Sequence, residues 1–390
     1  MKQDSTGYVN ELMEQFARNT GLEPENSNPK RYLWTDAFAV CNYLGLYNTT
    51  NNKVYLYIAL RLVNQVHHTL GKQRNDNPKN GWISGLDEET GEKHPTIGGL
   101  RIGKEMNERM SAEIINESQE WDRDGQYYHY LTKWMHALNN TSRVTGDNKY
   151  IKWALELAES AHASFTYLPD HGTRKRMYWK MSIDLTRPLV FSMGQHDPLD
   201  GFITYNEIKN GMKDFQDGSS PESDLENEIR EITDICKGMG LTTDDPLGIG
   251  GLLSDATRIT QLISSGFLKN IELLEMVLDS SILGLRMYMK NDPMKYPAEY
   301  RLAFRELGLS IGLKGFEMMV DLINKNPELS QINSLQERIN LFEEYLGLGN
   351  NIEKFWMDKQ NRRTSNWMEH RDINTVMLAT VLEPNGFLRI

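Results

Sequence analysis

Hydrophobic residues recur at steps of three and four positions along most of the chain. Between residues 30 and 47, for example, this step holds for Leu33, Ala37, Val40, Cys41 and Leu44. Such spacing places the apolar side chains on one face of an α-helix. The same pattern predicts helices over 7–18, 30–47, 53–70, 121–145, 147–167, 178–193, 222–239, 247–265, 270–290, 297–324, 331–346 and 366–382. Alternating patterns typical of strands are scarce, so the sequence predicts an all-α fold.

The order of these helices indicates hairpins. Consecutive helices pair as 30–47 with 53–70, 121–145 with 147–167, 178–193 with 222–239, 247–265 with 270–290, and 297–324 with 331–346. The first helix, 7–18, and the last, 366–382, are left over, and pairing them would close a ring of six hairpins. The hairpins are spaced too widely for common solenoid repeats of about 33–47 residues. No linker divides the chain, so we expect a single domain over residues 1–390.

Two long connectors interrupt the helical pattern. Residues 72–104 contain Gly81-Trp82-Ile83-Ser84-Gly85, which predicts a β-hairpin or an ordered loop as a small insertion. Residues 194–221 contain Gly194-Gln195-His196-Asp197-Pro198. Connectors longer than about 12–15 residues are usually functional or disordered. Because these segments carry Trp, His and Gly rather than low-complexity sequence, we expect them to be ordered.

Several leading helices open with a tryptophan that an acid soon follows. The segments are Trp34-Thr35-Asp36, Trp121-Asp122-Arg123-Asp124, Trp179 with Asp184, and Trp367 with Asp372. In a ring of hairpins these N-terminal ends would face one common cavity. Helix N-termini stabilise acidic side chains and bind anionic groups. The pattern therefore indicates a polar, aromatic site at one end of the ring.

A ring of six helical hairpins is an (α/α)6 barrel. In hairpin number, length and helix starts, the sequence resembles the six-hairpin glycosidase-like superfamily. The stretch Trp34-Thr35-Asp36-Ala37-Phe38 is similar to the Trp-x-Asp-x-aromatic stretch of unsaturated glucuronyl and rhamnogalacturonyl hydrolases, in which such an aspartate is catalytic. The resemblance thus implies a catalytic role for Asp36. Sugar 2-epimerases of the same fold use histidines, for which the candidates are His129, His196 and His370.

Candidate catalytic acids follow from the chemistry of glycoside hydrolysis. The reaction uses two carboxylates, one protonated as general acid and one ionised as base or nucleophile. Asp36 and Asp124 are the first pair to test, and Asp184 and Asp372 come next. Asp124 has neighbours that would form the wall of a sugar site, namely Trp121, Tyr127, Tyr128 and His129. The alternative for each acid is a helix cap or a solvated carboxylate, since Asp caps helices readily.

Binding candidates are the tryptophans and the polar residues near helix starts. The tryptophans that would stack on sugar rings are Trp34, Trp82, Trp121, Trp179 and Trp367, with core packing as the alternative. At the start of the last helix, His370 is a candidate for proton transfer. Arg371 is a candidate for a bidentate clamp on a carboxylate. Arg187 and His196 are further binding candidates.

Composition narrows the partners and the location. The 390 residues include 43 Lys and Arg against 54 Asp and Glu, for a formal net charge of −11. This balance argues against nucleic acid and against an anionic membrane surface. The start of the chain lacks the apolar segment of a secretory signal, and no run of about 20 apolar residues occurs. We therefore expect a cytoplasmic protein with no membrane contact, a previously removed signal being the alternative.

Cofactor chemistry has no sequence signal. Cys41 and Cys236 lie in apolar helical patterns, where buried free thiols are expected. The nine histidines form no His-Glu-x-x-His pair, and no Cys-x-x-Cys motif occurs. We expect neither a metal nor a cofactor, and we leave the oligomeric state open.

The leading hypothesis is a carbohydrate-active enzyme, a glycoside hydrolase that cleaves oligosaccharide ends with paired carboxylates. The first alternative is a sugar 2-epimerase or isomerase that exchanges a proton at carbon with His196 and His370. Asp→Asn variants would inactivate the hydrolase, and His variants would inactivate the epimerase. The second alternative is a non-catalytic sugar-binding protein, which would bind a carbohydrate without turnover.

Overall fold

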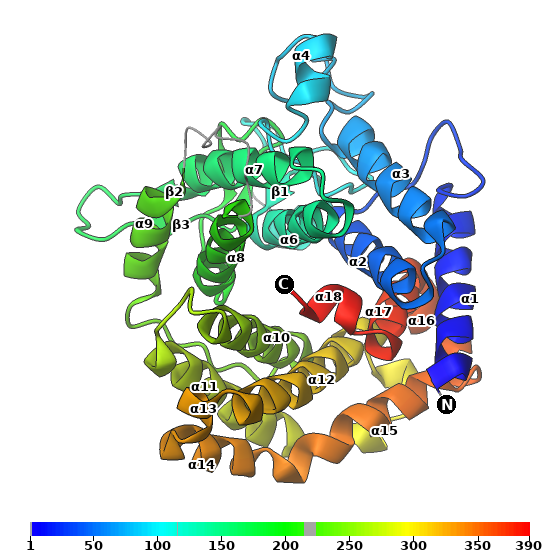
Figure 1. Cartoon of the computed structure of the whole chain (residues 1–390). Helices are drawn as coiled ribbons and strands as arrows, with labels where there is room; N and C mark the ends of the chain where they lie inside the picture. Colours follow the sequence, from blue (N-terminus) through cyan, green and yellow to red (C-terminus); the bar gives the residue numbers. More distant parts are fainter. Residues whose placement is uncertain (1, 115, 214–223) are drawn as a thin grey trace. The chain divides into compact units, whose positions relative to one another are not determined.

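The computed structural model describes residues 2–114, 116–213 and 224–390. They form two compact units, which Figure 1 colours along the chain. Unit 1 consists of Met1–Asn19, Asn48–Asn51 and Gly240–Ile390, and unit 2 consists of Thr20–Tyr47 and Asn52–Met239. The expectation of one domain closed by helices 7–18 and 366–382 stays a prediction.

Unit 2 is built mainly from helices that pack as neighbours in the sequence. Its helices are α2 (Leu33–Thr50, which runs into unit 1), α3 (Lys53–Leu70), α4 (Glu88–Lys93), α5 (Glu117–Glu120), α6 (Tyr128–Thr145), α7 (Lys149–Phe165), α8 (Asp197–Met212) and α9 (Glu226–Cys236). Helix α6 packs against α7 and α8, and α8 packs against α9. These four successive helices therefore share part of the core of this unit.

Short strands of unit 2 hold the connectors before α6 and α8. Strands β1 (Gln126–Tyr127), β4 (Lys180–Met181) and β5 (Pro188–Val190) form an antiparallel sheet in the order β1-β4-β5. In its register Tyr127 lies opposite Lys180. Strands β2 (Thr166–Tyr167) and β3 (Arg176–Met177) form a separate antiparallel pair.

The expected helix over 178–193 is wrong, because this segment carries β4, β5 and the turn between them. Leu185 in that turn has a φ of 60°, a left-handed value that no α-helix contains. Helix α8 pairs with α9 instead, and it lies in the segment 194–221, which was expected to be a loop. Residues 214–221 of that segment lie outside the described part of the chain. Residues 72–104 form an ordered loop with α4 and a single bridge between Lys72 and Trp82.

The regular elements among the described residues of unit 1 are all helices. Its helices are α1 (Lys2–Thr20), α10 (Pro246–Ser264), α11 (Ile271–Met289), α12 (Ala303–Lys325), α13 (Pro327–Ser330), α14 (Asn333–Leu341), α15 (Leu346–Met357), α16 (Ser365–Glu369), α17 (Arg371–Leu382) and α18 (Asn385–Leu388). Four 3-10 turns join them: η1 (Pro293–Lys295), η2 (Ala298–Tyr300), η3 (Glu343–Tyr345) and η4 (Asn361–Arg363). Helix α12 packs against α10, α15 and α17.

Glycines allow α10 and α12 to approach each other closely. A Cβ added at Gly250 would lie 2.1 Å from the carbonyl oxygen of Gly308, and one added at Gly312 would lie 2.4 Å from that of Gly250. Real side chains do not tolerate such contacts with backbone, so these positions require glycine. The close crossing fixes the start of α12, which lines a cavity described below.

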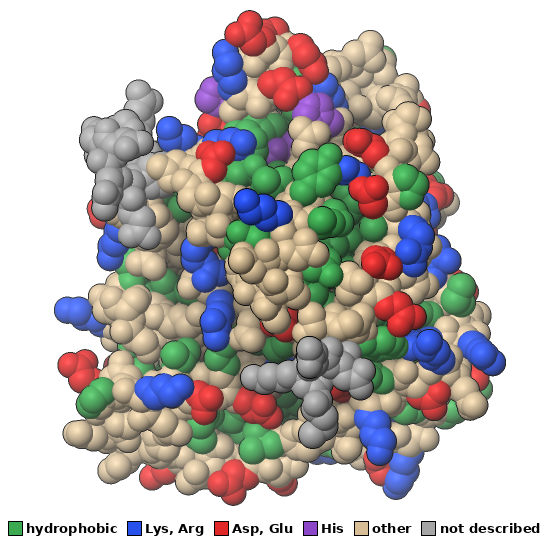
Figure 2. Space-filling view, turned by 45° about the vertical axis from the view of Figure 1, so that its right-hand side comes forward, with side chains coloured by type: hydrophobic (Ala, Val, Ile, Leu, Met, Phe, Trp, Pro, Cys, Tyr) green, Lys and Arg blue, Asp and Glu red, His purple; other side chains and the backbone are tan. Residues whose placement is uncertain are grey.

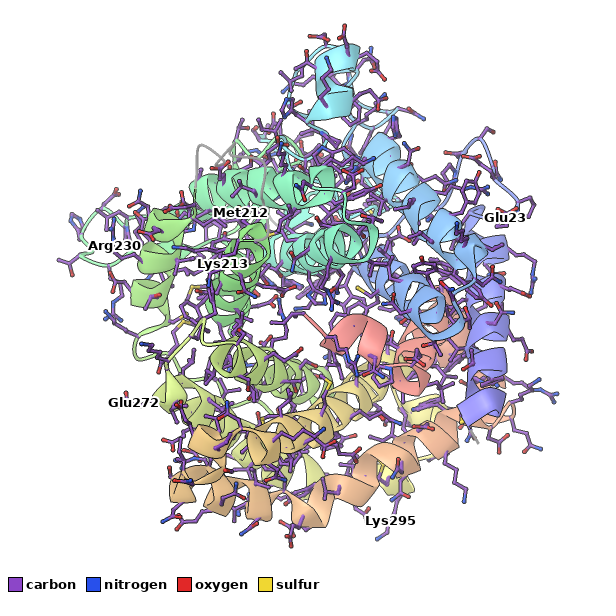
Figure 3. The ribbon with its side chains drawn as sticks, in the orientation of Figure 1. Glu23, Met212, Lys213, Arg230, Glu272 and Lys295 are labelled. Carbon is purple, nitrogen blue, oxygen red and sulfur yellow. The ribbon has the colours of Figure 1, made fainter. Side chains whose placement is uncertain are left out.

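Surface and interior differ as expected for a globular chain. On the face in Figure 2, acidic and basic side chains are interspersed. Figure 3 shows charged side chains such as Glu23, Arg230 and Glu272 extending outward from the ribbon. Among the described residues no helix has both the length and the apolar character needed to cross a membrane.

A buried histidine makes the stability of unit 2 sensitive to acid. His67 on α3 is 2% exposed and accepts a hydrogen bond through Nε2 from Trp134 Nε1, at 3.1 Å. Burial lowers the pKa of His67 to about 3, with a smaller effect of its neighbour His68. The unfolded chain therefore binds a proton at this position below about pH 6.5, while the folded chain does not.

Because of His67, we expect the free energy of unfolding to fall by about 1.4 kcal/mol for each unit that the pH drops between about pH 6.5 and pH 3. Urea unfolding of the wild type and of His67→Gln across this range checks the prediction. The variant should lose less stability than the wild type on acidification. Parallel pH profiles for the two proteins would show that His67 is not the cause.

Candidate functional site

Aromatic side chains of unit 2 gather around Trp179. The ring centroid of Trp179 lies 4.8 Å from that of Trp121, 5.6 Å from that of Tyr127 and 6.3 Å from that of His129, which it faces at 23°. Tyr130 continues the group, 4.9 Å from His129. We call the following set the aromatic wall: Tyr32, Trp121, Tyr127, His129, Tyr130 and Trp179. Trp121 is 53% exposed and Trp179 is half-buried, so part of the wall faces solvent.

A buried lysine on the small sheet supports this wall. Lys180 on β4 donates to the carbonyl oxygens of Glu120 at 2.6 Å and of Arg123 at 2.8 Å. Its ammonium also contacts the Glu120 carboxylate at 3.2 Å. Burial lowers the pKa of Lys180, although Glu120 opposes this effect. These three contacts hold residues 120–123 against β4, and so they place Trp121 beside Trp179.

A histidine and an aspartate meet where α6 and α8 begin. His129 Nδ1 lies 3.6 Å from Asp197 Oδ1. His129 Nδ1 and the other carboxylate oxygen, Asp197 Oδ2, are shielded from solvent and have no hydrogen-bond partner among the described residues. Leaving a buried polar group without a partner costs about 1–3 kcal/mol, and more for a charged one. An oxygen left free in this way is available to a substrate proton.

The position of Asp197 follows from local sequence. Asp197 is the first residue of α8 and Pro198 is the second, and proline is favoured in the first turn of a helix. A carboxylate at this end is stabilised by the helix dipole. A Cβ at Gly194 would lie 2.4 Å from Asp197 Oδ2, so the lack of a side chain at Gly194 leaves room for the carboxylate. His196, a predicted binding residue, is the N-cap of the same helix.

Asp36 orders one edge of the aromatic wall. Its carboxylate accepts the backbone N–H of Tyr32 at 2.9 Å and lies 3.4 Å from Arg31 Nη1, with both charged side chains buried. The Tyr32 hydroxyl in turn lies 2.7 Å from that of Tyr130. These contacts occupy both oxygens of Asp36, and they favour a role in positioning Tyr32.

Asp124 is fully buried within ion pairs. Its Oδ2 accepts from Arg101 at 2.6 Å and from Arg74 at 3.1 Å, and its Oδ1 accepts from the backbone N–H of Gly103 at 3.0 Å. The carboxylate therefore connects residue 74, residues 101–103 and residue 124, which are three separate stretches of the connector before α6. This arrangement favours a structural role for Asp124.

Asp184 lies in the turn after β4. Its carboxylate binds Lys79 at 2.8 Å, Ser182 at 2.9 Å and Thr186 at 2.7 Å. Burial alone would raise the pKa of Asp184, but these hydrogen bonds outweigh it and lower the pKa. Nearby, Arg187 donates to the carbonyl oxygen of Arg109 at 2.6 Å. Both side chains stabilise the loop structure around the sheet.

Three other predicted binding residues of unit 2 lie in its interior. Trp34 is 7% exposed and packs on Phe38 with ring centroids 4.4 Å apart. Trp82 is 2% exposed and lies under the ammonium of Lys72. The buried Tyr128 donates its hydroxyl hydrogen to Tyr205 at 2.8 Å. Their contacts are those of packing residues.

The remaining predicted site residues belong to unit 1. Trp367 is 5% exposed and stacks on Trp356 at 5.6 Å. His370 hydrogen-bonds the carbonyl oxygen of Asn366 through Nδ1, at 3.1 Å. Arg371 Nε and Asp372 Oδ1 lie 3.6 Å apart, and Asp372 also accepts from Asn19 at 3.4 Å. These side chains surround the junction of α16 and α17.

The structure thus brings together three predicted residues, Trp121, His129 and Trp179. It also includes Tyr127, which was expected in the wall of a sugar site, and it adds Tyr32, Tyr130 and Asp197. The run Tyr127-Tyr128-His129-Tyr130 at a helix start was a usable signal for two of them. Within the described ranges no cluster of three His, Cys, Asp or Glu side chains could hold a metal ion.

Comparisons with known proteins place this geometry in a fold. No family model and no curated protein matches the sequence. One similar solved structure is an inactive variant of the α-1,6-mannanase GH76A of Salegentibacter sp. HEL1_6, with two adjacent aspartates replaced, in complex with an α-1,6-mannotetraose. It is 14% identical, with 98% of this chain and 99% of that chain covered and a TM-score of 0.54.

A GH76 α-mannanase of Bacteroides thetaiotaomicron is 10% identical over 100% of both chains, with a TM-score of 0.55. A cellobiose 2-epimerase of Spirochaeta thermophila DSM 6192 is 11% identical over 96% of this chain and 97% of that chain, with a TM-score of 0.48. The likeness to the two mannanases confirms the predicted fold class. The chain has an all-α (α/α)6 barrel fold, with a small β insertion.

Proposed function

We propose that this chain is a carbohydrate-active enzyme, and specifically a glycoside hydrolase. The observation that carries the proposal is the aromatic wall of unit 2 beside Asp197, a buried carboxylate with one oxygen that lacks a hydrogen-bond partner in the described structure. Flat aromatic rings pack against the apolar face of a sugar, and a carboxylate acts as acid, base or nucleophile in glycoside hydrolysis. We expect the substrate to be an oligosaccharide.

Asp197 is our first catalytic carboxylate, in place of Asp36 and Asp124. The oxygens of those two acids are engaged by arginines and backbone N–H groups, which leaves them little capacity to exchange a proton. Asp184, also in unit 2, keeps its place as a candidate for the second carboxylate, and Asp372 of unit 1 stays a separate candidate. Each of the five is tested by an Asn variant in one assay.

The mannanases with this fold suggest which substrate to try first. The inactive Salegentibacter variant lacks two adjacent aspartates and binds an α-1,6-mannotetraose. In this chain the one adjacent pair is Asp244–Asp245, just before α10 in unit 1, where Asp245 pairs with Arg305 at 2.8 Å. α-1,6-Mannotetraose is therefore the first oligosaccharide to test, and an Asp244→Asn/Asp245→Asn variant belongs in the assay.

A sugar 2-epimerase is the second candidate, favoured by the contact of His129 with Asp197. A carboxylate beside an imidazole orients the ring and stabilises its protonated form, as proton exchange at carbon requires. A screen separates the two functions. It should include α-1,6-mannotetraose, aryl glycosides, unsaturated uronides and reducing sugars.

New reducing ends or released aryl groups would support hydrolysis, and interconversion of reducing sugars without cleavage would support epimerisation. Thermal stabilisation by a sugar without any turnover would instead support a binding protein. The cytoplasmic location expected from the sequence stays a prediction alongside these functions.

We expect Trp121→Ala to weaken substrate binding with little effect on folding, because Trp121 is 53% exposed. The loss of one stacking ring corresponds to about 0.5–1.5 kcal/mol, which is roughly a 2- to 12-fold rise in KM. Steady-state kinetics on the best substrate of the screen measures it. Tyr57→Ala is the matched control, because Tyr57 on α3 is 59% exposed and lies outside the aromatic wall. Equal KM values for both variants would contradict stacking at Trp121.

A further inference from the structure

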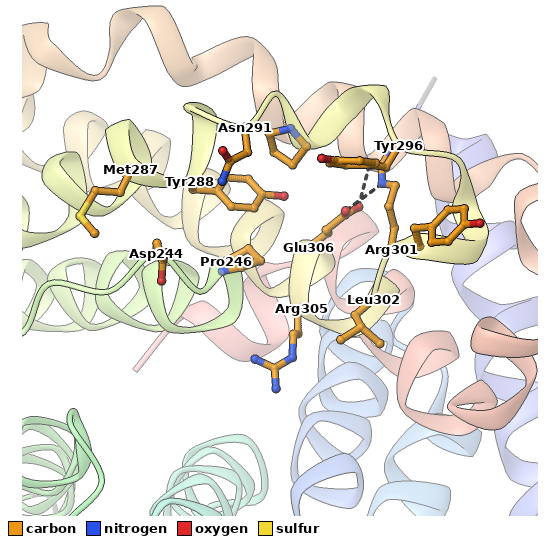
Figure 4. Close-up of a pocket in the computed structure, with 12 residues that line it drawn as sticks. Asp244, Pro246, Met287, Tyr288, Asn291, Tyr296, Arg301, Leu302, Arg305 and Glu306 are labelled. Atoms are coloured by element: carbon orange, nitrogen blue, oxygen red, sulfur yellow. Dashed lines mark hydrogen bonds and ion pairs between the residues drawn. The ribbon is translucent and has the colours of Figure 1, made fainter.

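A cavity of about 440 Å³ opens in unit 1, far along the chain from the aromatic wall. It lies where α11 ends and where α10 and α12 begin (Figure 4). Small-molecule sites in proteins are typically about 300–1,000 Å³, so one sugar ring or a similar ligand fits this volume. All its lining residues lie in unit 1.

Two ion pairs offset each other's charges around this cavity, and Asp244 adds one further carboxylate. Arg301 donates to both oxygens of Glu306, at 2.8 and 2.6 Å, and Trp356 Nε1 donates to the same carboxylate at 2.8 Å. Arg305 binds Asp245 at 2.8 Å. Two arginines and two acids, Glu306 and Asp244, line the space. An anionic ligand would gain nothing from such a lining, because both arginines are already paired, whereas a neutral polar ligand could use its donors and acceptors.

Several polar groups of the lining have unused hydrogen-bonding capacity. Arg301 is 4% exposed, yet its Nη1 has no hydrogen-bond partner in the described part of the chain, and neither does Arg305 Nε. The side chains of Tyr288, Asn291 and Asp244 also make no hydrogen bond with any described residue. The cavity therefore presents free donors and free acceptors together, as recognition of a polyol requires.

Tyrosine rings complete the lining. Tyr296 is 50% exposed and Tyr300 is 80% exposed, and both contribute to the cavity. The hydroxyl of Tyr288 has its pKa raised, mainly by burial, so it stays a neutral donor at physiological pH. Exposed aromatic faces beside mixed donors and acceptors match the apolar face and the hydroxyl rim of a pyranose.

We propose that this cavity is a second carbohydrate site, which binds one neutral sugar residue without cleaving it. The proposal rests on the proposed function for the class of ligand, and on the lining for the preference for a neutral sugar. Such a site would hold an oligosaccharide on unit 1 independently of turnover at the aromatic wall.

The test titrates the 390-residue chain with methyl α-D-mannopyranoside, methyl β-D-glucopyranoside and methyl β-D-galactopyranoside, with glucuronate as the anionic comparison. Binding is measured by calorimetry in the Trp121→Ala background, which weakens the aromatic wall. Hydrogen–deuterium exchange of residues 287–302 reports occupancy of the cavity itself. Tyr288→Phe removes one free hydroxyl, Tyr300→Ala removes one exposed ring, and Tyr57→Ala is the control.

We expect at least one neutral glycoside to bind and to protect residues 287–302 from exchange. Tyr288→Phe should weaken that binding roughly 2- to 12-fold, the effect of one hydrogen bond of about 0.5–1.5 kcal/mol. Tyr300→Ala should weaken it as well, and Tyr57→Ala should not. Absence of protection, equal affinities in all variants, or tighter binding of glucuronate would each overturn the proposal.

The result of this test can be distinguished from the result for the proposed function. Turnover in the substrate screen is scored with Asp197→Asn, whose residue belongs to unit 2. Turnover without protection of residues 287–302 would remove the second site and leave the hydrolase in place. Protection of residues 287–302 without any turnover would support the second site and argue against the hydrolase.

Discussion

Asp197→Asn is expected to lower kcat about 100- to 10,000-fold, the usual effect of removing a positioned acid or base. The amide keeps the size of the carboxylate but can neither take up a proton nor carry the negative charge next to His129. The protein should stay folded, because Asp197 Oδ2 makes no hydrogen bond with any described residue. Initial rates on the best substrate of the screen, with a thermal melt of each protein, measure both quantities.

Asp184→Asn and the Asp244→Asn/Asp245→Asn variant serve as comparisons in this experiment. Asp184 is bound by Lys79, Ser182 and Thr186, and we expect its variant to retain more activity than Asp197→Asn. If the Asp244→Asn/Asp245→Asn variant loses turnover while Asp197→Asn does not, the catalytic centre lies in unit 1 and our assignment is wrong.

Asp124→Asn is expected to act on stability. Breaking a buried ion pair leaves the partner charge without compensation, at a cost of about 3–5 kcal/mol. Here the stranded charge is Arg101, whose side chain is 8% exposed, while Arg74 keeps its ion pair with Asp76. We expect a clear fall in the free energy of unfolding, measured by urea denaturation.

The matched comparison is again Asp184→Asn, because the Lys79–Asp184 pair is partly exposed and such pairs contribute about 0–1 kcal/mol. A variant of Asp124 that melts like the wild type but has lost turnover would return Asp124 to the catalytic candidates. Loss of stability with turnover retained in the folded fraction would support the structural role.

Helix α3, which has one apolar face, was predictable from sequence; of two helices that are buried on all sides, α2 was predicted and α8 was missed. Helix α3 matches its predicted bounds of 53–70, because its apolar and polar faces differ. Helix α8 is buried from Asp197 to Ile208, so it has no polar face and no helical period to detect. The strands that replace helix 178–193 have two or three residues each, too few to show alternation.

Only those residues of the candidate site that stand in aromatic and acidic clusters of the sequence were predictable. Trp121, Trp179 and His129 stood out because aromatic residues and acids occur together in the sequence. The contact between His129 and Asp197 joins two helix starts that are far apart along the chain, and tertiary packing alone creates it. Asp36 and Asp124 ranked first because sequence does not reveal that Arg31 and Arg101 bind their carboxylates.

A crystal structure of Asp197→Asn with the oligosaccharide that the wild type turns over tests the central claim most directly. Our account predicts a sugar ring against Trp179 and Trp121, with the amide of residue 197 within hydrogen-bond distance of the bond to be cleaved. An oligosaccharide bound elsewhere, with the aromatic wall empty, would contradict it.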